Sequence, residues 1–168
     1  IDARSRRVEH TNDIGIRAQL TPKLSADVRL RFIQVRFDAD PIFDATSLAQ
    51  TMNRNERYVT TTVRYAITPL TSLFTAGQAL EERFILSPVR DADSTRVVGG
   101  VELHPRALLS GTASVGYQRF RPESTALPGF AGVVGTVGLS YRLGTSTNLT
   151  GSFDRHPDYS YAVLEPYY

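Results

Sequence analysis

Apolar and polar residues alternate with a period of two over long stretches of this chain, and that pattern constrains the fold more than any other feature. Ile14 and Ile16 alternate with Asp13 and Arg17, for example, and the pattern recurs along the whole chain. Such alternation puts successive side chains on opposite faces of a β-strand. The stretches approach the roughly 9–11 residues that a tilted strand needs to cross a bilayer, so we predict about eight long strands.

Short turns and longer polar loops alternate between these stretches. The turns are expected at residues 21–25, 68–72, 104–108 and 144–148, and the loops at residues 38–56, 87–93, 121–129 and 156–165. Outer-membrane barrels have short turns on one side and long loops on the other. The sequence therefore predicts an all-β fold, an antiparallel up-and-down meander of about eight long strands that is part of a transmembrane outer-membrane β-barrel.

A water-filled barrel carries its polar residues on the lumen face and aromatic girdles at the two ends of its lipid face. The lumen-facing charged candidates are Arg29, Arg31, Arg64, Glu81, Arg83, Glu102, Arg142 and Asp154. The aromatic girdle candidates are Phe37, Tyr65, Phe84 and Tyr141.

Two stretches fit the alternation less well. Val35 and Phe37 take over from Val28 and Leu30 as the apolar set, which predicts a β-bulge near residues 33–34. In residues 74–84, the polar residues Gln78 and Glu82 interrupt the face that we assign to lipid with Phe74 and Phe84.

Reactive chemistry is sparse in this sequence. The chain has no cysteine, and its three histidines show no metal-ligand spacing. No nucleophile elbow, phosphate-binding loop or dinucleotide fingerprint occurs, so we expect no enzyme, no cofactor and no metal site. A formal net charge of only +2 argues against nucleic-acid binding.

Several short motifs resemble the putative β-barrel porin 2 family. They lie in residues 90–94, 99–102, 105–111, 116–117, 128–130 and 158–161, and the resemblance extends from about Arg57 onward. It implies a bacterial outer-membrane barrel of more than eight strands. Some members accompany exopolysaccharide secretion machinery, so the resemblance implies glycan export by association.

We therefore expect a pore or export conduit in the bacterial outer membrane, linked to exopolysaccharide secretion. The expected partners are outer-membrane lipid, polysaccharide or small solutes, and periplasmic secretion components. Two alternatives remain: a structural or anchoring barrel without transport, and a soluble carbohydrate-binding β domain. Residues 1–7 lack the apolar region of a signal peptide and residues 165–168 resemble the start of a strand, so we expect residues 1–168 to be a single segment cut from a larger barrel.

Overall fold

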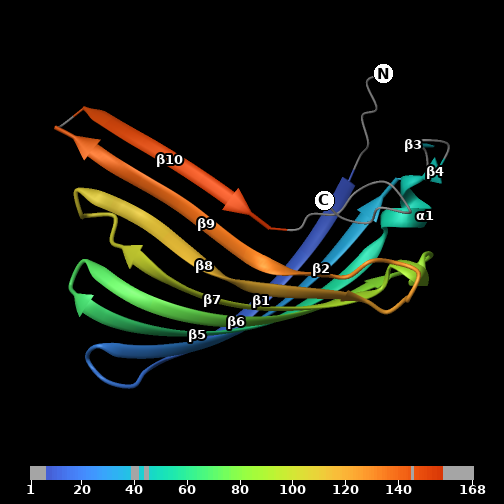
Figure 1. The fold of residues 1–168 in the computed structure, drawn as a ribbon, viewed down its shortest axis with the longest axis horizontal. Helices are drawn as coiled ribbons and strands as arrows, with labels where there is room; N and C mark the ends of the chain where they lie inside the picture. Colours follow the sequence, from blue (N-terminus) through green and yellow to red (C-terminus); the bar gives the residue numbers. More distant parts are fainter. Residues whose placement is uncertain (1–6, 39–41, 44–45, 145, 157–168) are drawn as a thin grey trace.

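Eight long strands form one antiparallel sheet in the computed structural model, which describes residues 7–38, 42–43, 46–144 and 146–156. The strands follow one another as an up-and-down meander in the order β1-β2-β5-β6-β7-β8-β9-β10 (Figure 1). Their bounds are β1 Arg7–Gln19, β2 Leu24–Phe37, β5 Arg54–Thr68, β6 Thr71–Phe84, β7 Ala92–Leu103, β8 Leu109–Pro122, β9 Phe130–Leu143 and β10 Thr147–Arg155. The predicted fold class is confirmed, including the number and order of the strands.

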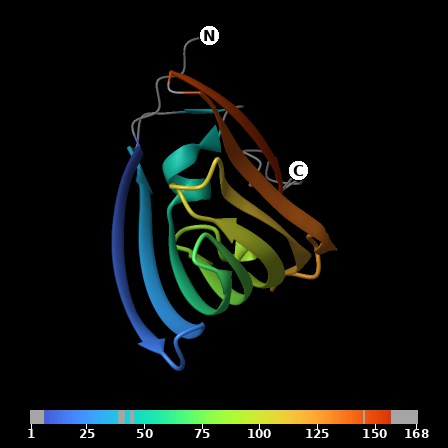
Figure 2. The same ribbon diagram turned by 90° about the vertical axis from the view of Figure 1, so that its left-hand side faces the viewer.

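The sheet curves into an open trough, with β1 and β10 as its two edges (Figure 2). Short turns join the strands at one end of the trough, and longer connections lie at the other end (Figure 1). In the turn between β1 and β2, the Thr21 hydroxyl accepts the Leu24 N–H at 3.0 Å. In the turn after β9, Gly144 has a φ of 64°, a left-handed conformation that glycine adopts without steric cost.

The longest connection joins β2 to β5, and its described helix lies inside the trough (Figure 2). It contains the short strands β3 (Ile42–Phe43) and β4 (Thr46–Ser47) and the helix α1 (Leu48–Met52). Leu48 and Met52 pack against Val35 and Phe37 at the end of β2, which forms a small buried apolar cluster. The face of the sheet that carries Val35 and Phe37 is therefore the concave face.

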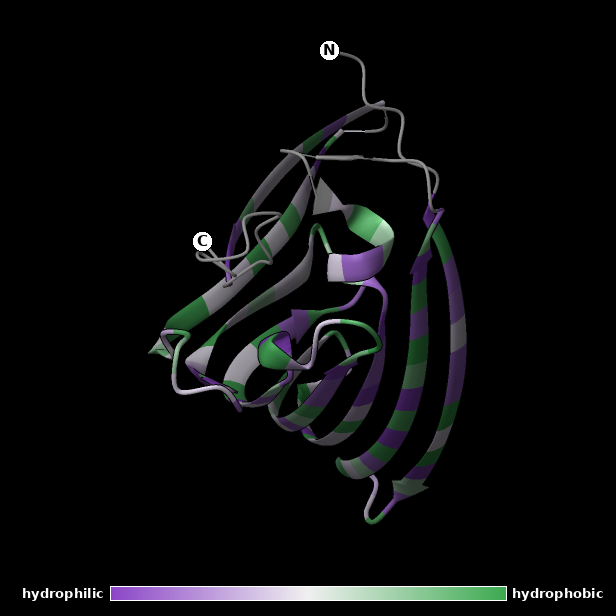
Figure 3. Ribbon diagram, turned by 90° about the vertical axis from the view of Figure 1, so that its right-hand side faces the viewer, coloured by the Kyte–Doolittle hydropathy of each residue, from purple (hydrophilic) through white to green (hydrophobic). Residues whose placement is uncertain are grey.

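Directly paired residues on neighbouring strands lie on the same face of a sheet, so the register assigns a face to every strand position. Leu30 pairs with Ile14 on one side and with Val59 on the other, and all three lie on the convex face. Large apolar side chains are exposed there, among them Ile16 (78 %) and Val115 (63 %). Figure 3 shows the resulting stripes of hydrophobic and hydrophilic residues along the strands.

The convex face carries a broad band without charge. From the short turns up to Phe32 on β2, Val59 on β5, Ala79 on β6 and Tyr117 on β8, none of the outward-facing residues that the structure describes is Asp, Glu, Lys or Arg. On β5 the band covers about nine residues, which span about 23 Å at ~3.3 Å per residue and a tilt of about 40°. That height matches the apolar band of about 25 Å on membrane barrels.

The expected bulge near residues 33–34 is wrong. The pairing of β2 with β1 and with β5 runs without a register shift, so Val35 and Phe37 stay on the same face as Arg29 and Arg31. The apolar residues at the end of β2 lie on the concave face because they support α1.

The expected orientation of β6 is also reversed. Leu73 pairs with Tyr65 and Val101 on the convex face, so Phe74 and Phe84 point to the concave face. The Phe74 ring lies over Gly100 of β7, where a Cβ atom would come within 2.7 Å of the ring. The composition of β6 alone misled the assignment, because the pairing with its neighbours fixes which face is which.

Among the described residues, no helix is both long enough and apolar enough to cross a membrane.

A matched pair of substitutions on β8 tests the two faces. Val115→Arg should lower the free energy of folding into liposomes by about 2–4 kcal/mol, because it places a charge in the middle of the uncharged band. Ser114→Arg, one residue away on the concave face, should cost far less. Urea titration of both variants in lipid vesicles measures the difference, and equal losses would refute the assignment of faces.

Candidate functional site: the concave face

On the concave face, ion pairs connect β1, β2, β5 and β7 in the half of the sheet toward the short turns. The Asp13 carboxylate on β1 forms ion pairs with two arginines of β2. Its oxygens lie 2.7 Å from the Arg31 guanidinium and 3.6 Å from that of Arg29. Asp27 on β2 pairs with Arg64 on β5, and Arg64 also reaches Glu102 on β7 at 3.3 Å. Arg17 lies 3.8 Å from Asp27. We call Asp13, Arg17, Asp27, Arg29, Arg31, Arg64 and Glu102 the turn-side network.

A second charged cluster lies on the concave face near the long connections. Arg54 Nε lies 2.7 Å from Glu56 and 3.8 Å from Glu82, which is directly paired with Glu56 across β5 and β6. The Tyr58 hydroxyl donates to the second Glu56 oxygen at 2.8 Å. These groups are nearly inaccessible to solvent: Arg54, Glu56 and Glu82 are 8 %, 6 % and 3 % exposed.

Phe84 closes this loop-side cluster from the side of the long connections. The Arg54 guanidinium lies 5.8 Å from the centre of the Phe84 ring, and that of Arg90 lies 5.4 Å from it. A cation over an aromatic face is attracted by the ring quadrupole. Phe84 therefore lies on the concave face, where its ring contacts buried cations. The expected position of Phe84 in a girdle on the lipid face is wrong.

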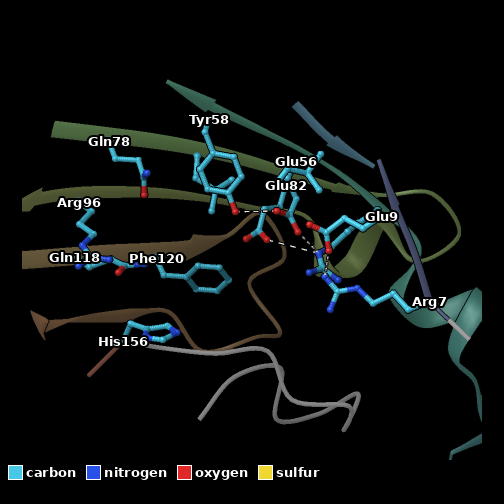
Figure 4. A pocket seen from close by; sticks show the side chains of 13 residues that line it. Arg7, Glu9, Glu56, Tyr58, Gln78, Glu82, Arg96, Gln118, Phe120 and His156 are labelled. Atoms are coloured by element: carbon cyan, nitrogen blue, oxygen red, sulfur yellow. Dashed lines mark hydrogen bonds and ion pairs between the residues drawn. The ribbon is translucent and has the colours of Figure 1, made fainter. Parts of the chain in front are cut away.

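A polar cavity of about 360 Å³ opens in front of the loop-side cluster (Figure 4). Gln78, Arg96 and Gln118 line one side of it, and Tyr58 and Phe120 contribute aromatic rings. A second cavity of about 290 Å³ lies next to it and is lined by Arg29, Arg31, Arg64 and the hydroxyls of Thr60 and Thr62. The two cavities share Ile33, Tyr58 and Gln78, so a mainly polar lining connects one charged group to the other.

The other half of the concave face is almost neutral. Polar residues and glycines occupy most inward positions of β8, β9 and β10, with Phe120, Phe130 and Val134 among the apolar ones and Arg142 and Asp154 as the charged exceptions on these strands. The inward polar residues are Ser110, Thr112, Ser114, Gln118, Thr136, Ser140, Asn148, Thr150 and Ser152. Thr136 donates to Asp154 at 3.3 Å, and Thr150 lies within hydrogen-bond distance of Ser140. The trough thus combines a charged wall with a hydroxyl-rich wall.

The structure places six of the eight charged residues expected in the lumen on the concave face. Arg29, Arg31, Arg64, Glu102, Arg142 and Asp154 lie on the concave face. Glu81 and Arg83 lie on the convex face, because β6 has the opposite orientation from the one expected. They belong to an ion-pair group outside the trough.

Of the four expected girdle residues, two lie on the convex face and two on the concave face. Tyr65 and Tyr141 lie on the convex face near the short turns, with exposures of 48 % and 38 %. Phe37 and Phe84 lie on the concave face and are 7 % and 4 % exposed, so they do not contact lipid from the convex side.

Sequence reasoning missed the loop-side cluster entirely. Glu56 was assigned to a loop, and Glu82 was treated as an interruption of an apolar face. One signal was present: Arg54, Glu56 and Tyr58 share a parity with Arg64, which was assigned to the lumen. Extending that parity backwards along the strand identifies the cluster.

The described residues contain no group of three or more His, Asp or Glu side chains arranged to hold a metal ion. Among the acidic loop residues, Asp91 accepts the Phe84 N–H at 2.7 Å and Asp93 pairs with Arg83 at 3.0 Å. The acidic loop residues Asp40, Asp44 and Asp158 lie outside the described residues.

The family model described as putative beta-barrel porin 2 matches residues 4–160. The chain belongs to this family. The match covers all eight long strands, and it accounts for the trough as part of a β-barrel porin wall. No curated protein and no solved structure matches the chain.

The loop-side cluster of this porin-family protein generates a stability prediction. Arg54→Ala removes the guanidinium that lies 2.7 Å from Glu56 and 3.8 Å from Glu82, two carboxylates buried side by side, which should cost about 3–5 kcal/mol. Adding Glu82→Gln removes one of the two charges and should recover a large part of that loss. A double-mutant cycle from urea titrations measures the coupling, and strictly additive effects would contradict the proposed ion-pair cluster.

Proposed function

We propose that this protein is a pore of the bacterial outer membrane that passes hydrophilic solutes through the lumen bordered by the concave face. One contrast carries the proposal: the convex face has a membrane-high band without charge, whereas the concave face carries ion pairs, hydroxyls and amides. A wall of this kind separates lipid from water. The charged side chains would then set the selectivity of the pore, as rings of charge do in channels.

Further strands should complete the wall in the membrane. The outer backbone edges of β1 and β10 are not paired with each other in the part of the chain described. Unpaired N–H and C=O groups cost several kcal/mol each in hydrocarbon, so a lipid-embedded sheet must close. We infer that additional strands pair with both edges, which would give a barrel of more than eight strands and a wider lumen.

A polysaccharide is the narrower candidate for the transported solute. The hydroxyl-rich wall of β8–β10 offers many weak donors and acceptors, and Tyr58 and Phe120 add aromatic surface. Such a lining suits a flexible, hydroxylated polymer that must slide past without tight binding. Its source would be an export step that delivers the polymer from the periplasm, where the short turns would meet secretion components.

The inward insertion supports a second candidate, a barrel with an anchoring rather than a transporting role. Helix α1 occupies part of the trough and is fixed to β2 by Leu48 and Met52. Asn53 strengthens this attachment by accepting the Phe37 N–H at 2.7 Å. If matching insertions filled the remaining lumen, the barrel would be plugged.

Conductance separates these candidates. The full-length protein in planar bilayers should show ion-conducting steps if it is a pore. Arg29→Gln together with Arg31→Gln should shift the permeability ratio toward cations, because Asp13 then lacks its two cationic partners. Arg57→Gln on the convex face serves as the control and should leave the ratio unchanged. Silent bilayers with correctly folded protein would favour the plugged barrel.

Cysteine labelling tests the orientation. The chain has no cysteine, so each introduced thiol reports a single site. A cysteine at Leu127, in a long connection, should react with an impermeant maleimide on intact cells. A cysteine at Lys23, in a short turn, should react only after the outer membrane is broken. The reverse labelling pattern would invert the topology.

A further inference from the structure

We propose that the convex surface at the loop end of β5–β8 binds the phosphate-bearing headgroup of a membrane lipid. The proposal depends on the membrane position of the barrel but not on what passes through its lumen. The residues that carry it form a group that we call the charged collar: Arg57, Glu81, Arg83, Asp93, Arg119, Arg121 and Glu123.

The charged collar borders the uncharged band directly. Arg57, Glu81, Asp93 and Arg121 follow one another in a single cross-strand row on β5, β6, β7 and β8. The next row toward the short turns contains Val59, Ala79 and Thr95, and ends in Arg119. Charge on the convex face of these strands therefore begins within two adjacent rows near the long connections. At the opposite end of the same strands, the described outward positions carry no charge, so among these residues the charged collar is confined to the loop end.

The ion pairs within the charged collar are distributed unevenly. Arg83 attracts all three carboxylates, at 3.0 Å from Glu81, 3.0 Å from Asp93 and 2.9 Å from Glu123. Arg57 has one contact, to Glu81 at 3.4 Å, and its side chain is 66 % exposed. Within the described part of the chain, exposed Arg119 and Arg121 form no ion pair. Three guanidinium groups therefore point outward with most of their donors available.

An apolar groove runs from the uncharged band to Arg57 and Arg83 of the charged collar. It has a volume of about 470 Å³. Leu30, Phe32, Val59 and Ala79 form its apolar wall. At its charged end stand Arg57 and Arg83, together with the carboxylates Glu81 and Asp93 that Arg83 already neutralises. Its lining changes along its length from apolar to charged side chains, in the same order as a lipid molecule changes from acyl chain to charged headgroup.

Charge and shape together select a lipid phosphate as the occupant. Guanidinium groups bind phosphate oxygens in a bidentate, charge-assisted geometry. A free anion would use only the exposed arginines, where water and salt weaken the attraction. A lipid would add the burial of its chain in the groove, and the membrane would hold its phosphate at the height of the charged collar.

Lipid-dependent stabilisation of the full-length protein tests the site. The protein, folded in an uncharged detergent, is titrated with bisphosphorylated lipid A, with phosphatidylcholine or with inorganic phosphate. The readout is the temperature at which its folded, fast-migrating gel band disappears. Lipid A should raise this temperature more than either of the other two. The double variant Arg57→Gln and Arg119→Gln should need about tenfold more lipid A for the same shift.

Matched variants separate the site from general charge effects. Arg29→Gln with Arg31→Gln removes the same number of charges from the concave face and should keep the wild-type response to lipid A. Arg57→Lys with Arg119→Lys keeps the charge and should recover most of the response. The proposal is overturned if phosphatidylcholine or inorganic phosphate acts as strongly as lipid A, or if the two Gln double variants respond alike. If the unheated wild-type protein shows no fast-migrating band at all, the membrane barrel is refuted, and the site with it.

Discussion

The hydrogen-bonding demand of the backbone in hydrocarbon determines the rest of this structure. No water is available in the bilayer core, so each N–H and C=O group there must find its partner in a neighbouring strand. Long strands, short turns and a meander order satisfy that demand with the simplest connections. Once the ladder is fixed, alternation gives every strand one side chain for lipid and the next for the lumen. The two edge strands are the places where the described sheet leaves this demand unmet.

Strand positions and turns could be predicted from the sequence, because both depend on local patterns. The alternation of Ile14 and Ile16 with polar residues, and the turns at residues 21–25 and 144–148, can be recognised without any knowledge of the neighbouring strands. The orientation of a strand is different. β6 carries apolar and polar residues on both faces, and only its pairing with β5 and β7 decides which face meets lipid.

The candidate site was predictable only where its residues lay on cleanly alternating strands. Arg29, Arg31 and Arg64 could be assigned because their neighbours left no doubt about the apolar face. Phe37 and Phe84 could not, since tertiary contacts that the alternation does not reveal determine their side: α1 for the first, and Arg54 and Arg90 for the second. An aromatic residue at a strand end serves equally well as a membrane girdle or as the support of an inward loop, and tertiary contacts decide between them.

The order of the sheet has a consequence for how such a wall can change over time. Each strand is bonded only to the strands that precede and follow it in the chain, once the short β3–α1 insertion is set aside. A duplicated hairpin could therefore enter at a turn and reform the same ladder on both sides. The registers elsewhere would be preserved, while the circumference would grow by two strands. In such an architecture, the diameter of the opening is a heritable quantity that evolution can adjust in steps, separately from the chemistry of its lining.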